Sequence, residues 1–524
     1  MRIVVLLILS ISIVFAKDKD TCYSVQLTSF VKKENSVYDF EAQNYPESCK
    51  LFSFSNVNAV RCGCFEKYGK AKQQQKVFEQ RYNNTLVVST YKYRFAPKKS
   101  METKDVSKTI VENNNLSEET TLEPEEQENI LENITVQGHI NLSAQRYLTK
   151  PSGKHASNYT ASAELEMAYN KEALKAFAKL RAQQDYYDLQ GTSAHNNRSY
   201  LRLQELYMKY DLENSQLFFG KNIRFWGALE LKNITDVFNL SDFRSDPTEN
   251  DKMGSWNAAY TYYSDDAEIS AIVKFYEQDR KMPAFPYVYY PFTNQLVTYD
   301  STVQSEKSRM RPSVYLKYSG TADSEYALDY AFIFENGYDS QRYFNTPIAP
   351  DFKVYENAYL VNKLITYNTL VIDSTLYKLE AVYTDVLNNK MISDYYHLGF
   401  GVEHTLTQIY KEADLGLLVE YYRYGRFQSD RYDDLELFEV FQNDLFIGAR
   451  YSFNEGNNAS IVGGAMLDLE YNEQVYYIKY EGRINDIIKL HLDYRQTEPS
   501  STYETALKRM GKQKRVSIKA GYYF

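Results

Sequence analysis

The sequence predicts a mainly β protein: a transmembrane antiparallel β-barrel of about 16–18 strands, preceded by a small α+β domain. Three observations predict this fold. The chain ends on an alternating strand, and it combines 50 Tyr and 28 Phe with a net charge of -9 and a mean hydropathy of -0.54. From residue 134 onward, long and short connections alternate between strands. A barrel wall needs apolar side chains only at every second position, so a polar composition is compatible with crossing a membrane.

The C-terminal segment, residues 515–524, alternates apolar and polar side chains and stops on Phe524. This spacing places the apolar residues on one face of a strand. The ending resembles the terminal signal that the outer-membrane assembly machinery of Gram-negative bacteria reads. The resemblance implies a location in the outer membrane, with lipids around the barrel and contact with that machinery through Phe524.

The N-terminal segment predicts export. Residues 1–16 contain a basic Arg2, an apolar run from Ile3 and a small residue, Ala16, before Lys17. This is the pattern of a cleaved signal peptide. No later stretch approaches the roughly 20 apolar residues that a membrane helix requires.

Residues 17–98 form a predicted periplasmic domain with the order βαββαβ, whose first helix covers 37–45. The chain has four cysteines, all within this domain: Cys22, Cys49, Cys62 and Cys64. In an oxidising compartment they predict two disulfides, with three connectivities open.

Segments 23–30 and 60–65 of this domain resemble the SPOR domain, a small periplasmic fold that binds septal peptidoglycan. The resemblance implies peptidoglycan glycan strands as a partner. The sheet face expected to bind them carries Gln26, Ser29 and Arg61. Residues 99–133 are acidic and lack apolar periodicity, which predicts a disordered, extended linker.

The predicted barrel covers residues 134–524 and contains about 18 strands, an even number, as single-chain bacterial barrels have. Connections after even-numbered strands are short, for example 170–172 and 213–214. Connections after most odd-numbered strands are long, for example 223–254 and 279–312. Outer-membrane barrels alternate extracellular loops and periplasmic turns in this way, so both ends of the barrel are expected in the periplasm.

Strand alternation also predicts which side chains face the lumen. In 268–275, Ile269, Ala271 and Val273 are expected to point outward. The predicted lumen is polar and carries both signs of charge. Its candidate residues are Lys274, Lys378, Glu380, Glu403, Arg450 and Asp468.

The connection that begins at residue 223 has a distinctive composition. Segment 217–227 mixes glycines with Trp226, one of only two tryptophans, and it leads into 233–243. This stretch, together with 443–453, resembles the alginate-export-like group of outer-membrane barrels, which implies a porin-like pore. If the loop folds inward, Lys221, Arg224, Asp236 and Asp242 form a charged constriction. The alternative is an Arg224–Asp236 pair that fastens the loop to the wall.

No motif predicts catalysis. The six histidines are scattered, and no nucleophile motif, metal-ligand cluster or phosphate loop accompanies them. We therefore expect no catalytic residue, no metal, no cofactor and no nucleic-acid partner. The sequence predicts passive passage of small or charged solutes through a channel tethered to peptidoglycan. The alternative is a structural anchor between outer membrane and cell wall whose barrel is closed or plugged. The oligomeric state stays open.

Overall fold

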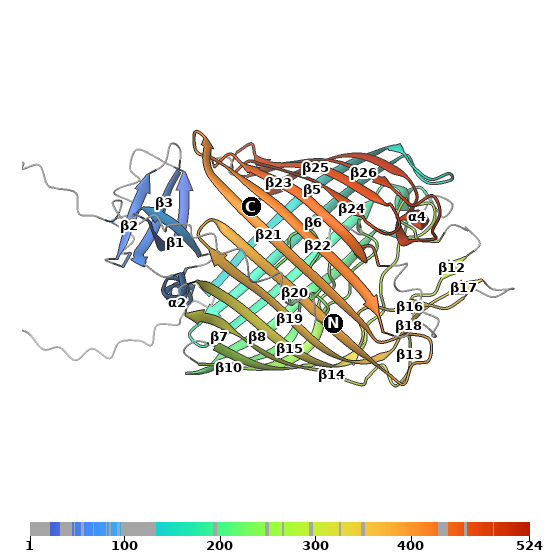
Figure 1. Ribbon diagram of the computed structural model, residues 1–524, viewed down its shortest axis with the longest axis horizontal. Coiled ribbons are helices and arrows are strands. Elements are labelled where there is room, and N and C mark those ends of the chain that lie inside the picture. Colours follow the sequence, from blue (N-terminus) through green and yellow to red (C-terminus); the bar gives the residue numbers. More distant parts are fainter. Residues whose placement is uncertain are drawn as a thin grey trace, which may run out of the picture. The chain divides into compact units, whose positions relative to one another are not determined.

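The chain is described as a computed structural model that divides into two units, one containing the N-terminal domain and one containing the barrel (Figure 1). The structure describes residues 21–31, 45–46, 48–53, 57–65, 68–79, 81–82, 85–91, 95, 133–191, 196–246, 251–264, 267–292, 297–323, 326–346, 352–427, 439–454, 458–485 and 487–524. The predicted signal peptide and the acidic linker, apart from residue 133, lie outside these ranges.

The second unit is a closed antiparallel barrel of 18 strands, which confirms the predicted fold class. Its strands are β5 (Ile134–Thr149), β6 (Ser157–Lys171), β7 (Leu174–Asp185), β8 (Tyr200–Asp211), β9 (Ser215–Asn222), β10 (Ser255–Tyr263), β11 (Ala267–Lys274), β14 (Ser313–Asp323), β15 (Ala327–Tyr338), β19 (Leu360–Ile372), β20 (Thr375–Leu387), β21 (Tyr395–Tyr410), β22 (Ala413–Arg426), β23 (Asn443–Ser452), β24 (Ser460–Asp468), β25 (Gln474–Arg483), β26 (Ile488–Glu498) and β27 (Gln513–Tyr523). Each pairs with the next along the chain.

The last strand closes the barrel against the first. β27 pairs antiparallel with β5, from Lys514 beside Thr149 to Tyr523 beside His139. Phe524 follows the last residue of β27. Its backbone and that of Gly138 in β5 form two hydrogen bonds of 2.9 and 3.0 Å. The alternating C-terminal segment is therefore the seam of the barrel.

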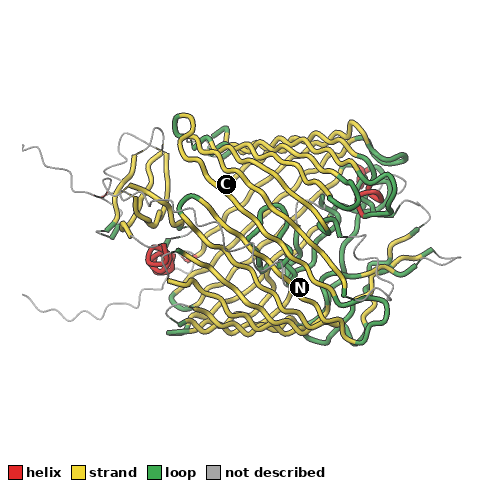
Figure 2. Tube along the Cα trace, in the orientation of Figure 1, coloured by secondary structure: helices red, strands yellow, loops and turns green. Residues whose placement is uncertain are grey.

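Tight hairpins join the strands at the end where the barrel begins and finishes. Two-residue turns follow Lys171, Ile372 and Tyr410, and the first residue of each turn has a positive φ of 48°, 50° and 54°. A positive φ at this position matches the twist of antiparallel strands. Most of the longer loops gather at the opposite end, on the right in Figure 2. They include the short strands β12 (Thr298–Tyr299), β13 (Gln304–Ser305), β16 (Tyr343–Phe344), β17 (Lys353–Val354) and β18 (Glu356–Ala358), and the helices η3 (Tyr187–Leu189) and α4 (Ala506–Met510).

Several strand boundaries differ from the prediction, and the difference at β19 has an identifiable cause. A strand over 355–367 was expected, but the wall strand is β19, Leu360–Ile372. Residues 356–358 instead form β18, which pairs with two other loop strands, β13 and β16. Local alternation could not reveal this because it does not show that this segment pairs with other loop strands.

The two faces of the wall have different chemistry. Outward side chains such as Leu142, Ile269, Phe332, Leu364 and Ile478 are 51% to 64% exposed. Inward side chains include many polar and charged residues, and a closed wall leaves no unpaired strand edge. An apolar outside around a polar inside is the architecture of outer-membrane barrels. Among the described helices, none is long and apolar enough to cross a membrane.

The first unit contains a four-stranded sheet in the order β2-β3-β1-β4. Its elements are β1 (Thr21–Val31), β2 (Cys49–Ser53), β3 (Val57–Phe65), α2 (Tyr68–Glu79) and β4 (Leu86–Tyr91). Helix α2 packs against β1 and β4. Residues 37–44 of the expected first helix lie outside the described ranges.

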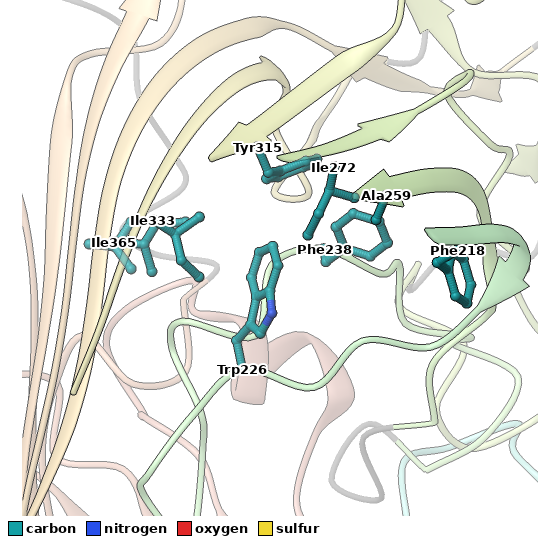
Figure 3. Close-up of a cluster of buried hydrophobic side chains, with 9 residues drawn as sticks. Phe218, Trp226, Phe238, Ala259, Ile272, Tyr315, Ile333 and Ile365 are labelled. Carbon is teal, nitrogen blue, oxygen red and sulfur yellow. The ribbon is translucent and has the colours of Figure 1, made fainter. Parts of the chain in front are cut away.

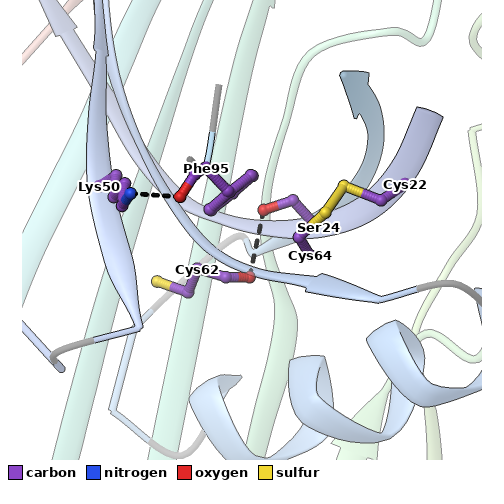
Figure 4. Close-up of a disulfide and its surroundings, with 6 residues drawn as sticks. All are labelled: Cys22, Ser24, Lys50, Cys62, Cys64 and Phe95. Atoms are coloured by element: carbon purple, nitrogen blue, oxygen red, sulfur yellow. Dashed lines mark hydrogen bonds between the residues drawn. A yellow bond between two sulfur atoms is a disulfide. The ribbon is translucent and has the colours of Figure 1, made fainter. Parts of the chain in front are cut away.

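Two disulfides fasten β3 to both of its neighbours in this sheet. Cys49–Cys62 joins opposite residues of β2 and β3, and Cys22–Cys64 joins β1 to β3. The hydroxyl of Ser24 adds a hydrogen bond of 3.1 Å to the carbonyl of Cys62 (Figure 4). The prediction of two disulfides is confirmed, and one of the three connectivities is selected.

Candidate functional site

The connection between β9 and β10, residues 223–254, folds into the barrel; its described parts are 223–246 and 251–254. We call it the inner loop. Asn239 holds its base together, because its side-chain amide donates to the carbonyls of Asn222 and Met253, at 3.1 and 2.9 Å. The same side chain accepts from the backbone N–H of Arg224 at 2.8 Å. One buried amide thus ties the start, the middle and the end of the loop.

Aromatic packing covers the inside of seven consecutive strands of the wall. Trp226 and Phe238 of the inner loop belong to one buried cluster with inward residues of seven consecutive strands (Figure 3). The wall residues are Phe218, Ala259, Ile272, Tyr315, Ile333, Ile365 and Val382. The rings of Trp226, Phe238 and Tyr315 lie 5.0 to 5.6 Å apart. Burial of large rings on this scale fixes the loop against the wall.

Beyond this cluster, the tip of the inner loop reaches β20, where Glu380 receives it. The Glu380 carboxylate is fully buried and accepts the backbone N–H groups of Ala228, Leu229 and Thr235 at 2.6, 2.9 and 3.1 Å. Hydrogen bonds to an ionised acceptor are stronger than neutral ones. Glu380 therefore acts as an anchor for the loop backbone.

A second carboxylate, two strands further along the wall, holds the next part of the tip. Glu420 of β22 accepts from the backbone N–H groups of Glu230 and Leu231 at 2.6 and 3.0 Å. It also accepts from the Tyr422 hydroxyl at 2.7 Å, and that hydroxyl accepts from the N–H of Lys232 at 3.1 Å. The two buried carboxylates together receive five backbone N–H groups.

Between these two strands, β21 offers a socket for a loop side chain. Gly399 and Gly401 face inward, and Leu229 fills the space where their side chains would stand. A Cβ on Gly401 would lie 2.8 Å from Leu229 Cδ2. Leu229 and Ile234 pack further against Leu418 and Phe446. Glycine in a strand interior here permits the close approach of another segment.

The four residues predicted to form the constriction do not converge. The Arg224 guanidinium donates to the Asn257 side-chain oxygen at 2.9 Å and stacks on Phe218. Asp236 pairs with Lys252 at 3.5 Å, whereas Asp242 pairs with Arg244 at 2.7 Å and with Arg202. The expected alternative, an Arg224–Asp236 pair, is not formed, because Lys252 occupies the place beside that carboxylate.

Lys221 does not face the lumen. It lies on β9 with the same parity as Leu217 and Phe219, which are 47% and 59% exposed on the outer face. Its ammonium group donates to the Leu203 carbonyl at 2.7 Å. The strand continues to Asn222, so alternation carries Lys221 to the outside.

The six residues predicted for the lumen all lie on inward positions of the wall, and each has a partner. Lys274 pairs with Glu277 at 3.2 Å, and Lys378 pairs with Glu403 at 2.8 Å. Arg450 pairs with Glu230 at the tip of the inner loop. Asp468 accepts from Gln442 at 2.8 Å. Glu380 differs because its partner is the loop backbone.

Some charged side chains of the inner wall and of the loop tip remain in contact with solvent. Lys179 bridges Glu164 and Glu166 at 2.7 and 2.8 Å while its side chain remains 22% exposed. The side chains of Arg450 and Glu230 are 34% and 35% exposed. These paired charges of both signs keep parts of the inner wall hydrated, although the inner loop also reaches β26 and β27, where Asp246 pairs with Arg495 and Arg515.

The sequence analysis did not identify Glu420 as a second anchor or the two glycines that make room for Leu229. Glu420 has the inward parity of its strand, between the outward residues Val419 and Tyr421. The same alternation that selected Glu380 could therefore have found it. Gly399 and Gly401 are two residues apart and therefore lie on the same face of the strand. Two glycines in this arrangement indicate that another segment packs closely against that face. What the sequence could not reveal is that Leu229 is the side chain that fills the space.

No family model matches this chain, and no curated protein matches it by sequence. Solved structures with similarity include the outer membrane protein OpdK of Pseudomonas aeruginosa, at 8% identity with a TM-score of 0.45, covering 76% of this chain and all of that one. OccK8 (OprE) of the same organism has 10% identity and a TM-score of 0.45, covering 75% and 99%. OmpT of Vibrio cholerae has 10% identity and a TM-score of 0.36, covering 75% and 97%. Identities of this size do not transfer residue roles.

Proposed function

We propose that this protein is an outer-membrane channel through which small or charged solutes diffuse, with the inner loop narrowing the lumen. One observation supports it above the others. A loop is anchored across part of the lumen by buried carboxylates, while charged groups elsewhere on the inner wall, such as Lys179 with Glu164 and Glu166, stay partly exposed. A barrel that serves only as a scaffold has no need for polar, hydrated side chains on its inner wall.

Conductance of the full chain in a planar lipid bilayer tests this proposal. Discrete, steady current steps support a channel. A correctly folded barrel that gives no current would refute it and favour the closed anchor.

The Arg450–Glu230 pair lies on the exposed side of the loop tip and offers a test of charge selection. Glu230→Gln leaves an uncompensated cation in the lumen, so the reversal potential in a salt gradient should shift toward anion preference. Arg450→Gln leaves an uncompensated anion and should shift it the other way. Shifts in the same direction, or no shift in either variant, would show that this pair does not face the permeating ions.

We further propose that the first unit attaches the barrel to peptidoglycan. Its sheet brings two of the expected binding residues together, because Arg61 donates from Nε to the side-chain oxygen of Gln26 at 2.9 Å. The third, Ser29, lies on β1, and its side chain lies outside the described residues. A neighbouring guanidinium and amide supply donors that suit the hydroxyl and carbonyl oxygens of a glycan.

Co-sedimentation of the detergent-solubilised full chain with purified peptidoglycan tests the attachment. Arg61→Ala should lower the pelleted fraction. Lys76→Ala, on the exposed surface of α2, is the matched control and should not. Absence of pelleting by the unaltered chain would remove this part of the proposal.

A further inference from the structure

A second feature lies on the outer face of the barrel, at the seam. Outward side chains of β24–β27, β5 and β6 line a shallow hollow of about 620 Å³. Its apolar members are Ala144, Ile461, Ile478, Leu492, Val516 and Ile518, accompanied by Tyr159, Tyr480 and Tyr494. Arg146 is the one cation among the lining residues that points outward.

Arg146 occupies an unusual position for a charge. On β5 it has the parity of Leu142 and Leu148, which are 64% and 63% exposed, while Tyr147 beside it is buried inside. Arg146 therefore stands within the apolar outer band, three residues before the strand ends. A cation on the lipid-facing surface is costly unless it reaches a polar partner near the interface.

Lys514 adds a second cation on the same face. It is the next outward residue of β27 beyond Val516, and Val516 pairs with Arg146. Lys512 stands nearby, but it is already paired with Glu498 at 2.6 Å. Glu498 also interacts electrostatically with Lys514, although the two do not form an ion pair. Among the residues that the structure describes, no carboxylate forms an ion pair with Arg146 or Lys514.

We propose that this hollow binds a phosphate-bearing lipid of the outer leaflet. Its acyl chain lies along the apolar and tyrosine side chains, and its headgroup phosphate lies at Arg146 and Lys514. Two features identify the ligand class: an apolar trough that accepts hydrocarbon, and two cations at its rim that accept an anion, of which Arg146 forms no ion pair among the described residues. An Arg guanidinium binds phosphate through two parallel N–H donors, and Lys supplies a point charge beside it. The choice of leaflet rests on the proposed outer-membrane function, because both cations lie at the end of the barrel that carries the long connections.

The test measures binding of bisphosphorylated lipid A to the full chain in detergent, by native mass spectrometry. The comparison ligands are the same lipid without phosphates, and inorganic phosphate alone. The variant R146Q/K514Q should lower the affinity for lipid A by about tenfold or more. R146K retains charge and should keep most of the binding. K411Q removes an exposed lysine at the opposite end of the barrel and should bind as the unaltered chain does.

Three results would overturn the proposal: equal affinity in the unaltered chain and the double variant, equal affinity for the dephosphorylated lipid, or full competition by inorganic phosphate at equal concentration. Bilayer conductance is recorded for the same preparations. Both cations lie outside the lumen, so loss of lipid binding should leave conductance unchanged. A chain that binds lipid A through these residues but conducts no current would refute the channel and leave the lipid site standing.

Discussion

The double substitution Glu380→Gln with Glu420→Gln should release the tip of the inner loop. Each substitution keeps the size of the side chain and exchanges one carboxylate oxygen for an amide donor. At Glu380, one oxygen accepts from Ala228 and Leu229 and the other from Thr235. Whichever way the amide turns, a donor then faces a donor, and the remaining bonds lose their charge assistance.

The size of the effect follows from the number of bonds affected. A hydrogen bond to a charged group contributes about 1.5–3 kcal/mol, so the loss of one bond at each site weakens docking by about 3–6 kcal/mol. Since 1.4 kcal/mol corresponds to a factor of ten, the ratio of docked to undocked loop falls at least about 100-fold. Burial of Leu229 and Ile234 still contributes about 1.5–3 kcal/mol each, so the loop should undock transiently rather than leave the lumen.

Single-channel recording in a planar bilayer detects this change. The unaltered chain should give a steady current, and the double variant should flicker to a higher conductance level. Glu403→Gln is the matched control: it lies on the intervening strand and pairs with Lys378, and no hydrogen bond or ion pair joins it to the described parts of the inner loop. A folded double variant with the same conductance and the same noise as the unaltered chain would refute the anchoring role of both carboxylates.

Three further predictions concern glycines and disulfides. Gly399→Val should displace Leu229 from its socket and produce the same current fluctuations. Gly138→Val should impair closure of the seam, since its Cβ would lie 2.7 Å from a backbone oxygen and 2.8 Å from the Phe524 ring, and the heat-modifiable folded band on a gel should decrease. Replacing both cysteines of Cys22–Cys64 by serine should destabilise the first unit by about 1 kcal/mol more than removing the other disulfide, because the closed loops span 42 and 13 residues. Hydrogen exchange of β1–β4 in the full chain measures the difference.

Each of these predictions has a control or a contrary outcome. Gly416→Ala, on β22, should leave both folding and current unchanged, because the nearest atom to its Cβ would be 3.7 Å away. A quiet current in Gly399→Val would show that the socket does not hold the loop. Normal folding of Gly138→Val would mean that the seam tolerates a side chain there. Equal protection after removal of either disulfide would contradict the loop-length argument.

The barrel wall was predictable because each strand and turn can be recognised from neighbouring residues in the sequence. Alternation with a period of two indicated which face of each strand meets lipid, and turn residues marked where strands end. The closing strand 515–524 and the inward position of Glu380 followed from that periodicity alone. The boundary error at β19 arose where local alternation competed with pairing to strands in the loops.

The interior of the lumen was not predictable in the same way. Charged residues and a tryptophan indicated that the inner loop is unusual. The details predicted from them were wrong, because Lys221 faces outward and the Arg224–Asp236 pair does not form. The anchors of the loop lie 145 to 190 residues away from it in sequence. Alternation assigns a side chain to the inside of the wall, but only the closed barrel determines which residues meet across the lumen, because that depends on how 18 strands bring distant segments together. The sequence by itself determined the wall and its two faces, and the tertiary structure decided what fills it.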